Sequence, residues 1–417
     1  MADPIRVLHF ADVHIGMENY GKTDPNSGLS SRVVDFLRRM DEMIDYAREN
    51  EVDLTIFAGD AFKTRSPNPT YQREFAWRIR DLAELAPVVL LVGNHDLPPN
   101  MLKASSIEIY NTLAVPNVFV AHDYDVWRIS TRRGDVIVGT APYPIRARLM
   151  QHIETSGHTI RDIDHALEET LTDLLVKLAD DADKEAGSDD IPRILTAHFT
   201  VRGAKFGSER SVMLGRDVQV GLNLLADNRW DYVALGHIHK HQNLTHDRTD
   251  APPVVYSGSL ERIDFGEESD TKGFCWVELE RGNAQWDYVR VAARPMVTLR
   301  VDCRTETRPT HKVVDMIRKH NLQDAIVRLV VELTPESDAS LHDTPIREVL
   351  KKSGVFHVAA IKRDIQRPER SRIATNPEGM THEELLEQYF ISREVEPERR
   401  AVLLEAARAI IKAETDI

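Results

Sequence analysis

The stretch VDLTIFAGD, residues 52–60, decides the fold class of this chain. Most of it is apolar, and it ends in Gly-Asp, a pattern that is typical of a buried strand of a sheet. Similar apolar runs occupy residues 5–11 and 88–92, and helical patterns at residues 33–49 and 71–85 separate the three runs. Strands that alternate with helices in this way predict an α/β fold.

The alternation continues as far as residue 235 and then changes. Beyond Pro253 three strand patterns follow one another without helices, which suggests a meander that closes the first domain. Arg294 and Pro295 mark its expected boundary. The later elements of this domain are expected as a helix at residues 160–178 and strands at residues 137–139, 193–197, 232–235, 254–257, 274–279 and 286–291.

Two smaller segments follow the expected first domain of residues 1–293. Residues 294–374 carry three strand patterns and two helical patterns, which predicts a compact α+β domain. The proline-containing stretch at residues 363–377 is interpreted as a linker. Residues 375–417 are predicted to form a helical pair, with Thr381 as the N-cap of the first helix and Pro397 at the first position of the second.

The composition is that of an ordinary globular protein. Its 417 residues suffice for about two to four domains. No segment approaches the roughly 20 uninterrupted apolar residues of a membrane-spanning helix, and no signal-peptide pattern precedes the first strand. The two cysteines, Cys275 and Cys303, are too few for a disulfide framework. We therefore expect a cytoplasmic protein that does not span a membrane.

The charge of the chain is acidic overall but unevenly distributed. Lysine and arginine number 53 and aspartate and glutamate 67, a net charge of −14 that argues against indiscriminate binding to polyanions. Residues 294–374 hold 16 basic and 11 acidic side chains, whereas residues 375–417 hold 5 and 10. A basic middle segment suits contact with phosphates. Surface charge also varies along chains without any function, so both interpretations stay open.

Five short polar motifs follow strand patterns of the first domain. Ligands of an open α/β sheet bind beyond the carboxyl ends of its strands, so five strand ends can converge on one crevice. Each motif alone is a weak signal, because Gly-Asp often forms a turn and a lone histidine is usually a half-buried structural residue. Their ordered combination indicates a site. The motifs are Asp12-x-His14, Gly59-Asp60, Gly93-Asn94-His95-Asp96, His198 and Gly236-His237-x-His239.

The residue types of these motifs suit a pair of hard or borderline divalent cations. Two ions about 3.5 to 4 Å apart can clamp both sides of an in-line displacement at phosphorus. Such a pair needs a shared anionic ligand, and Asp60, which follows the central strand, is the best candidate. His237 and His239 are two positions apart, so an extended segment directs both imidazoles to one side. The sequence therefore predicts a dinuclear metal site.

The order of the motifs resembles that of the calcineurin-like metallophosphoesterases and, more closely, the SbcD-type DNA exonuclease subunits. The resemblance covers residues 5 to about 291 and extends to the terminal helical pair, while the middle segment is similar mainly in position and size. It implies a metallophosphoesterase sandwich with a small α+β capping domain and a C-terminal helical pair. The motifs that carry it are ADVHIG (11–16), AGDAF (58–62), VGNHD (92–96), ALGHIH (234–239) and YSGSLER (256–262).

The resemblance implies two Mn²⁺ ions per chain, with Mg²⁺ or another divalent ion as the alternative. His95 would be the catalytic histidine that stabilises the transition state and protonates the leaving oxygen, a task that suits an imidazole titrating near neutrality. The implied ligands are Asp12, His14, Asp60 and His239 for one ion, and Asp60, Asn94, His198 and His237 for the other.

Four cations near these motifs are candidates for DNA contacts. Close relatives can carry a histidine shortly after the bridging aspartate, where this chain has Lys63. Lys63 and Arg65 can contact DNA phosphates as a point charge and as a fork, respectively. Arg202 and Lys205 begin the loop of residues 202–216, whose basic residues can follow a phosphate backbone. Solvated loop cations are the alternative interpretation for all four.

The resemblance also implies partners. Residues 294–374 would cap the active site and help to admit DNA, and residues 375–417 would bind the coiled coil of an SMC-like ATPase, SbcC. The alternative for this helical pair is packing against its own body. A homodimer would form through the helices expected at residues 71–79 and 107–113.

The resemblance thus implies a manganese-dependent DNA nuclease, both a double-strand exonuclease and a structure-specific or single-strand endonuclease. It would process double-strand breaks or hairpins in DNA repair and recombination, together with SbcC. The alternative is a phosphodiesterase or phosphatase for small molecules or phosphoproteins on the same scaffold. Residues 295–417 argue against this alternative, because a small-substrate enzyme needs neither a cap nor a separate apolar helical pair.

Overall fold

The computed structural model describes most of the chain and divides it into two compact units. The first unit comprises Met1–Thr298, Leu322–Arg328 and Lys352–Ala359, and the second comprises Leu299–Asn321, Leu329–Lys351 and Ala360–Ile417. The described residues are 3–25, 27–98, 103–150, 160–187, 190–207, 217–366, 382–393 and 395–415.

The first sheet of the larger unit has six strands in the order β14-β13-β1-β2-β3-β4. Its central strands are parallel, and the β13–β14 hairpin extends the sheet by pairing antiparallel with β1. The strands are β1 (Ile5–Phe10), β2 (Leu54–Phe57), β3 (Val88–Leu91), β4 (Val118–Ala121), β13 (Gly273–Glu280) and β14 (Asn283–Arg290).

The second sheet also has six strands, in the order β11-β12-β10-β7-β6-β5. Strands β6, β7, β10 and β12 run parallel, and β5 and β11 pair antiparallel at the two edges. The strands are β5 (Asp125–Thr131), β6 (Gly134–Ala141), β7 (Arg193–His198), β10 (Tyr232–Gly236), β11 (Gln242–Asn243) and β12 (Val254–Tyr256).

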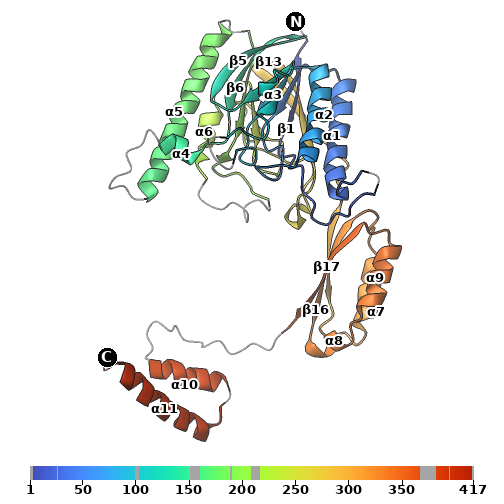
Figure 1. Cartoon of the computed structure of the whole chain (residues 1–417), viewed down its shortest axis with the longest axis vertical. Coiled ribbons are helices and arrows are strands. Elements are labelled where there is room, and N and C mark those ends of the chain that lie inside the picture. Colours follow the sequence, from blue (N-terminus) through green and yellow to red (C-terminus); the bar gives the residue numbers. More distant parts are fainter. Residues whose placement is uncertain are drawn as a thin grey trace. The chain divides into compact units, whose positions relative to one another are not determined.

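The two sheets face each other across a shared apolar core, and helices cover their outer faces. Alternate residues of β1 show this directly: Val7 belongs to the core between the sheets, whereas Leu8 and Phe10 belong to the core beneath α1 (Ser31–Glu49) and α2 (Pro69–Leu85). The long helix α5 (Ile160–Ala186) packs on the second sheet. Figure 1 shows α1 and α2 on one side of the sheets and α5 on the other.

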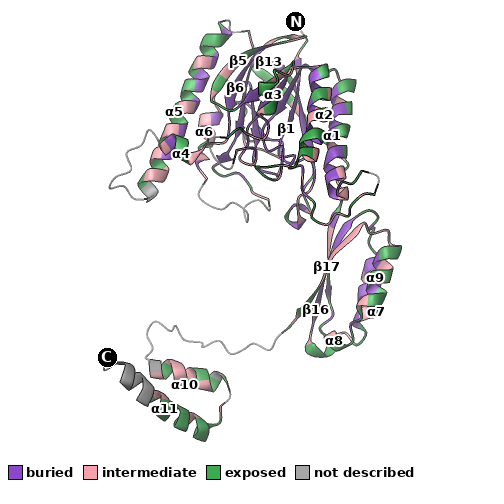
Figure 2. Cartoon of the chain, viewed as in Figure 1, coloured by how far each residue is buried: buried purple, intermediate pink, exposed green. Residues whose placement is uncertain are grey.

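The two helices that cover the first sheet begin where the sequence supplies caps. The side chain of Ser30 accepts a hydrogen bond from the backbone N–H of Arg32 at the start of α1. Asn68 caps α2 in the same way, and Pro69 follows it in the first turn. Both helices bury one face and expose the other, as the colours of Figure 2 show.

Short elements lie between the strands of the larger unit. The helix expected at residues 107–113 is shorter in the structure: α3 covers Ile109–Thr112, about one turn. Two short strands, β8 (Thr200–Val201) and β9 (Gln219–Val220), pair in parallel beside the second sheet. The other short elements are α4 (Arg146–Leu149), α6 (Leu222–Leu225) and the 3-10 helix η3 (Phe265–Glu267).

Beyond residue 295 the chain forms strands and helices in the expected α+β order. The three strands form a sheet in the order β15-β16-β17. β17 continues to Ile365, so the first residues of the stretch expected as a linker are in fact strand; Thr381 and the prolines at positions 368 and 377 lie outside the described residues. These elements are β15 (Met296–Asp302), α7 (Pro309–Arg318), β16 (Ile326–Leu333), α8 (Pro335–Ala339), α9 (Asp343–Lys352) and β17 (His357–Ile365).

The predicted C-terminal helical pair is present. It consists of α10 (His382–Ser392) and α11 (Pro397–Thr415), and the guanidinium of Arg408 on α11 forms an ion pair with Glu383 on α10. Large apolar side chains on the pair remain exposed, among them Tyr389 and Val402. Among the described helices, none combines the length and the apolar character needed to cross a membrane.

Candidate metal centre

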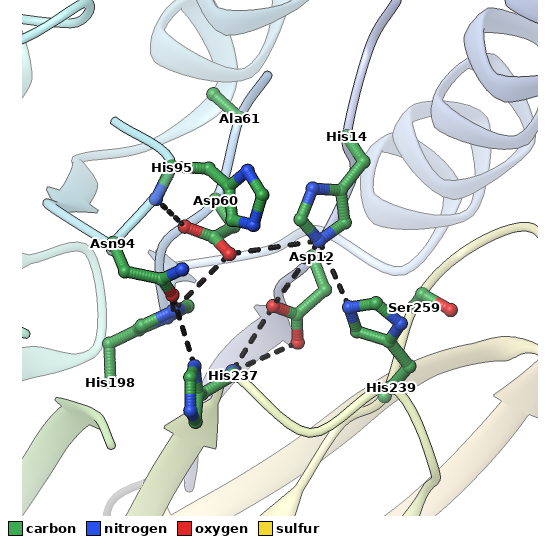
Figure 3. Close-up of polar contacts among 12 residues, drawn as sticks. Asp12, His14, Asp60, Ala61, Asn94, His95, His198, His237, His239 and Ser259 are labelled. Carbon is green, nitrogen blue, oxygen red and sulfur yellow. Dashed lines mark hydrogen bonds and ion pairs between the residues drawn. The ribbon is translucent and has the colours of Figure 1, made fainter. Parts of the chain in front are cut away.

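The five polar motifs meet at the carboxyl ends of strands from both sheets. Asp12 and His14 follow β1, Asp60 follows β2, and Asn94 follows β3 in the first sheet, while His198 is the last residue of β7 in the second. His237 and His239 follow β10, which pairs with β7 so that Gly236 lies opposite His198. Figure 3 shows the side chains of these seven residues pointing toward one another.

Asp60 lies in the middle of the cluster. Its Oδ2 is 3.7 Å from Nε2 of His14 on one side and 3.4 Å from Nε2 of His198 on the other. Nε2 of His14 is in turn 3.0 Å from Nε2 of His239 and 4.0 Å from Oδ1 of Asp12. The carboxylate expected to bridge two ions therefore has an imidazole nitrogen close to it on each side.

The amide oxygen of Asn94 completes the second half of the cluster. Its Oδ1 lies 3.0 Å from Nε2 of His198 and 3.0 Å from Nδ1 of His237. Two ligand atoms bound to one ion at about 2.1 Å are separated by about 3.0 to 3.4 Å at tetrahedral or octahedral angles. The 3.0 Å spacings in both halves lie in this range, whereas the 3.7 and 4.0 Å distances from His14 to Asp60 and Asp12 are longer. The residues present therefore fit divalent cations in both halves, with Asp60 between them.

Local geometry brings three groups of potential ligands within reach of single ions. In each group the ligand atoms lie within 4.8 Å of one another. The second group includes His95, which the sequence predicts to act in catalysis and not in metal binding. The groups are Asp12, His14 and His239; His14, Asp60 and His95; and Asp12, Asp60 and His198.

Burial shifts the protonation equilibria of the cluster. Burial raises the pKa of Asp12, although the neighbouring histidines act in the opposite direction, and burial lowers the pKa of His14. Burial opposes ionisation of both His198 and Asp60, but their mutual attraction outweighs it: the pKa of His198 rises to about 9 and that of Asp60 falls well below its usual value. Positive charge close to these buried carboxylates is therefore favourable, and a divalent cation bound by the carboxylates and imidazoles can supply it.

The backbone of the site is held in an unusual conformation. Four of its residues have φ angles in the left-handed region, which residues other than glycine rarely adopt. They are Asp12 at 53°, His14 at 49°, Asp60 at 65° and His237 at 96°. Such conformations cost roughly 1 to 3 kcal/mol each and persist where the surrounding structure enforces them, commonly at functional sites. Four of the seven expected ligands thus lie on sharply turned backbone just beyond a strand.

Glycine is required where two of these turns approach each other. A Cβ atom on Gly93 would lie 2.2 Å from Oδ1 of Asp60, and a Cβ on Gly59 would lie 2.4 Å from Nδ1 of His198. Gly59 also has a φ of 96°. The glycines that precede Asp60 and Asn94 in the sequence are therefore explained by the close approach of neighbouring ligand loops.

His95 is oriented by two hydrogen bonds. Its backbone N–H donates to Oδ1 of Asp60 at 2.8 Å, and its ring Nδ1 lies 2.7 Å from the carbonyl oxygen of Lys63. A carbonyl only accepts, so Nδ1 carries the hydrogen and Nε2 keeps its lone pair. The ring packs edge to face against His14 with centroids 4.9 Å apart. This arrangement permits proton transfer at the site and also places Nε2 near the cluster.

Several residues that support the cluster were not predicted from the sequence. Asp96 belongs to the quoted VGNHD motif, and its position two residues after Asn94 is a signal that could have been used. Asp217 contacts His237, and Glu267 contacts His239, but neither lies in one of the five motifs. Tyr143 follows β6, and its ring lies 5.7 Å from the ring of His237.

The four candidate DNA-contacting cations have different surroundings in the structure. Lys63 and Arg65 lie in the loop beyond Asp60, with Arg65 exposed. The guanidinium of Arg202 forms an ion pair with Glu168 of α5 at 2.8 Å, and the backbone of Lys205 hydrogen-bonds the side chain of Gln242. Residues 208–216, the remainder of the loop expected to follow a phosphate backbone, lie outside the described residues.

The cluster and its scaffold define a class of enzyme. Residues 5–241 match the calcineurin-like phosphoesterase family, and this range covers more than half of the chain. The chain belongs to the calcineurin-like phosphoesterase family. The predicted α/β metallophosphoesterase fold is thereby confirmed, and so is the prediction of a metal-dependent phosphoester hydrolase.

Relatives narrow the resemblance within this family. The chain is 29% identical over 404 residues to the SbcD subunit of the nuclease SbcCD from Escherichia coli strain K12, an alignment that covers 93% of this chain and 92% of the relative. It is 26% identical over 298 residues to the corresponding SbcCD nuclease subunit of Bacillus subtilis strain 168, with 70% and 71% covered. The similarity to SbcD-type subunits predicted from the motifs is confirmed.

Two solved structures align with the same share of the chain. A dimetal phosphatase from Danio rerio aligns with 69% of this chain and 99% of its own, at a TM-score of 0.39 and 9% identity. The protein TT1561 of Thermus thermophilus aligns with 69% of this chain and 100% of its own, at a TM-score of 0.37 and 15% identity.

Proposed function

We propose that this chain is the nuclease component of a DNA-processing complex, a manganese-dependent phosphodiesterase that cuts duplex ends and hairpins or single strands. The observation that carries the proposal is the convergence of six further ligand-type side chains around Asp60, in a chain that aligns over 93% of its length with an SbcD nuclease subunit. Processing of double-strand breaks in repair or recombination is the corresponding role.

We assign two ions to the two halves of the cluster. The imidazoles of His14 and His239 have Nε2 atoms 3.0 Å apart on one side of Asp60, and the Asn94 oxygen lies 3.0 Å from two imidazole nitrogens on the other. Carboxylate, amide and imidazole ligands without thiolates suit Mn²⁺, and Mg²⁺ is the alternative. The ligands proposed are Asp12, His14, Asp60 and His239 for one ion, and Asp60, Asn94, His198 and His237 for the other.

The ions would supply an activated water and neutralise charge on the phosphoryl oxygens. The residues of the chain do the rest: Asp60 holds both halves of the site together, and the lone pair on Nε2 of His95 can take up a proton and deliver it to the leaving oxygen. The hydrogen bond between Nδ1 of His95 and the carbonyl of Lys63 fixes the ring for this task.

DNA is favoured as the substrate by the surroundings of the centre. A cavity of about 770 Å³ is lined by Tyr143, whose ring contacts His237, and by the cations Arg65 and Lys103. Its lining also includes Arg146, which is paired with Asp164, and the acidic Glu108 and Asp123. Aromatic and basic side chains suit a nucleic-acid strand. Lys63 and Arg65 are proposed as phosphate contacts, while Arg202 and Lys205 are weaker candidates because both already have protein partners.

The remaining segments are proposed to serve DNA and partners. Residues 294–374 would act as the cap, and residues 375–417 would bind the coiled coil of an SMC-like ATPase. Homodimerisation through α2 and α3 is supported by three exposed apolar side chains: Trp77 is 45% exposed, Ile109 52% and Leu113 67%.

The test compares substrates on the purified full chain. Linear duplex DNA and a DNA hairpin should be cut in the presence of Mn²⁺. Bis(p-nitrophenyl) phosphate serves as the small phosphodiester for comparison. Cleavage should stop when the metal is chelated. Metal content should reach two ions per chain. If only the small phosphodiester or a phosphoprotein is hydrolysed, the alternative phosphatase function is correct.

A further inference from the structure

Two histidines of the centre each reach outward to a carboxylate on a distant segment. Nε2 of His237 lies 2.9 Å from Oδ2 of Asp217, and Nδ1 of His239 lies 2.9 Å from Oε1 of Glu267. The inner nitrogens face the cluster: Nδ1 of His237 is 3.0 Å from Oδ1 of Asn94. Each imidazole of the Gly236-His237-x-His239 motif is thus held between the centre and an acidic side chain.

These contacts determine which ring nitrogen carries the hydrogen. An ionised carboxylate only accepts hydrogen bonds, so Nε2 of His237 must donate to Asp217, and Nδ1 of His239 must donate to Glu267. The inner nitrogen of each ring is then left with its lone pair directed at the centre, as a metal ligand requires. Such outer carboxylates commonly orient a ligand histidine and increase its basicity.

The two carboxylates differ in what surrounds them. Glu267 is fully buried, and Nζ of the equally buried Lys272 lies 2.8 Å from its Oε2, so the negative charge of Glu267 is offset by a cation. Asp217 instead accepts hydrogen bonds from two neutral hydroxyls, Tyr143 at 2.8 Å and Thr200 at 3.2 Å. Among the described residues, no lysine or arginine pairs with Asp217.

The fold explains how Asp217 arrives at this position. His198 ends β7, and the chain continues directly into β8, whose Thr200 lies opposite Gln219 of β9. This two-stranded pairing returns Asp217, two residues before β9, to the side of the second sheet that carries His198 and His237. The carboxylate is held by Thr200 from this pairing and by Tyr143 from the turn after β6.

We propose that Asp217 is a positioning residue that strengthens one half of the metal centre. Because no lysine or arginine among the described residues offsets the charge of Asp217, its hydrogen bond makes His237 a better ligand as well as orienting it. The metal position formed by His237, His198 and Asn94 should therefore bind its ion more tightly. Glu267, neutralised by Lys272, mainly orients His239. The proposal rests on the proposed metal centre.

The test uses Asp217→Asn, which keeps the shape and an acceptor oxygen but removes the charge. Mn²⁺ binding to the metal-free full chain is measured by calorimetry, and Mn²⁺ electron paramagnetic resonance reports whether the two bound ions are magnetically coupled. We expect one of the two binding steps to weaken about 10- to 100-fold. The other step should change by less than about threefold, and the signal of the coupled pair should appear only at higher Mn²⁺. At saturating Mn²⁺ most of kcat should return.

Two further variants separate positioning from folding. Asp227→Asn makes the same charge change beside Arg229, outside the cluster, and should leave both binding steps unchanged. Asp217→Glu keeps the charge and should bind Mn²⁺ more tightly than Asp217→Asn. Unchanged binding in Asp217→Asn while the wild type binds two ions would overturn this inference alone. A wild type that binds no pair of ions would overturn the proposed metal centre and this inference with it.

Discussion

The carboxylate of Asp96 holds the loop that carries Asp60. Its Oδ2 accepts the backbone N–H of Asp60 at 2.8 Å, and its Oδ1 accepts the backbone N–H of Ala61 at 3.0 Å. The N–H of Gly93 donates to the same carboxylate at 3.1 Å. The last residue of the Gly93-Asn94-His95-Asp96 motif therefore fixes the turns after β2 and β3 to each other.

Replacement of Asp96 should loosen the bridging ligand. In Asp96→Asn one acceptor oxygen becomes an NH₂ group that faces backbone donors, so at least one buried N–H loses its partner, at a cost of about 1 to 3 kcal/mol. We expect a lower melting temperature of the metal-free protein and weaker binding of metal. Differential scanning calorimetry and metal titration measure the two effects. Wild-type values in both would show that Asp96 does not hold the loop.

Removal of the proposed bridge should abolish the centre. Asp60→Ala deletes the carboxylate that lies within 3.7 Å of His14 and 3.4 Å of His198, so we expect loss of at least one ion and near-complete loss of DNA cleavage. Metal content and cleavage rate are measured on folded protein, as judged by circular dichroism. Two ions per chain with normal activity would contradict the shared-ligand assignment.

His95→Asn should separate catalysis from metal binding. If His95 transfers a proton and is not a ligand, both ions stay bound while cleavage slows by about 10² to 10⁴-fold. The same metal and rate measurements apply. Because a ring nitrogen of His95 lies within 4.8 Å of ligand atoms of His14 and Asp60, loss of one ion from this variant would instead make His95 a ligand.

The buried His9 predicts a pH dependence of stability. Burial lowers the pKa of His9 to about 3, and its ring nitrogens contact the Tyr232 hydroxyl and the carbonyl of Leu235. The neutral form is favoured in the folded state, so the unfolded state takes up the proton first as pH falls below about 6.5. This group alone should reduce the free energy of unfolding by about 2 kcal/mol from about pH 7.5 to about pH 5.

The measurement compares denaturant unfolding of the metal-free wild type and His9→Gln over this range. The variant should be less stable at neutral pH but should lack this part of the pH dependence. If the free energy of unfolding depends on pH in the same way in both proteins, proton uptake by His9 on unfolding does not contribute to the pH dependence of stability.

The exposed apolar side chains of the C-terminal pair should bind the ATPase. Tyr389 and Val402 are 45% and 66% exposed, so Tyr389→Glu with Val402→Glu should barely change the unfolding temperature. In a desolvated interface the two charges should cost several kcal/mol of binding. Pull-down with the coiled-coil ATPase is the measurement. Arg399→Glu, on the same helix as Val402, is the matched control. Binding at the wild-type level by the double variant would place the interface elsewhere.

Truncation tests whether the same segment is modular. A chain that ends after residue 376 should keep its fold, its metals and its metal-dependent cutting of short single-stranded DNA. It should lose stable association with the ATPase. Aggregation of the truncated chain would show that residues 377–417 pack on the body.

The sequence by itself determined the chemistry of the site and the class of the fold. Apolar runs such as residues 52–58 mark strands wherever they occur, and the motifs that follow them name seven side chains that the structure does bring together, from Asp12 to His239. This was predictable because the side-chain period of a strand and the polar residue at its end are local properties of the chain.

Only the tertiary structure decided how those side chains are supported. Asp217 and Glu267 reach His237 and His239 from 20 and 28 residues away, and nothing in their local sequence indicates these contacts. The left-handed backbone of Asp60 likewise depends on a distant residue, since Asp96 accepts the backbone N–H groups of Asp60 and Ala61. Such contacts join segments that are distant along the chain, so they are fixed by the packing of two sheets and not by any local pattern.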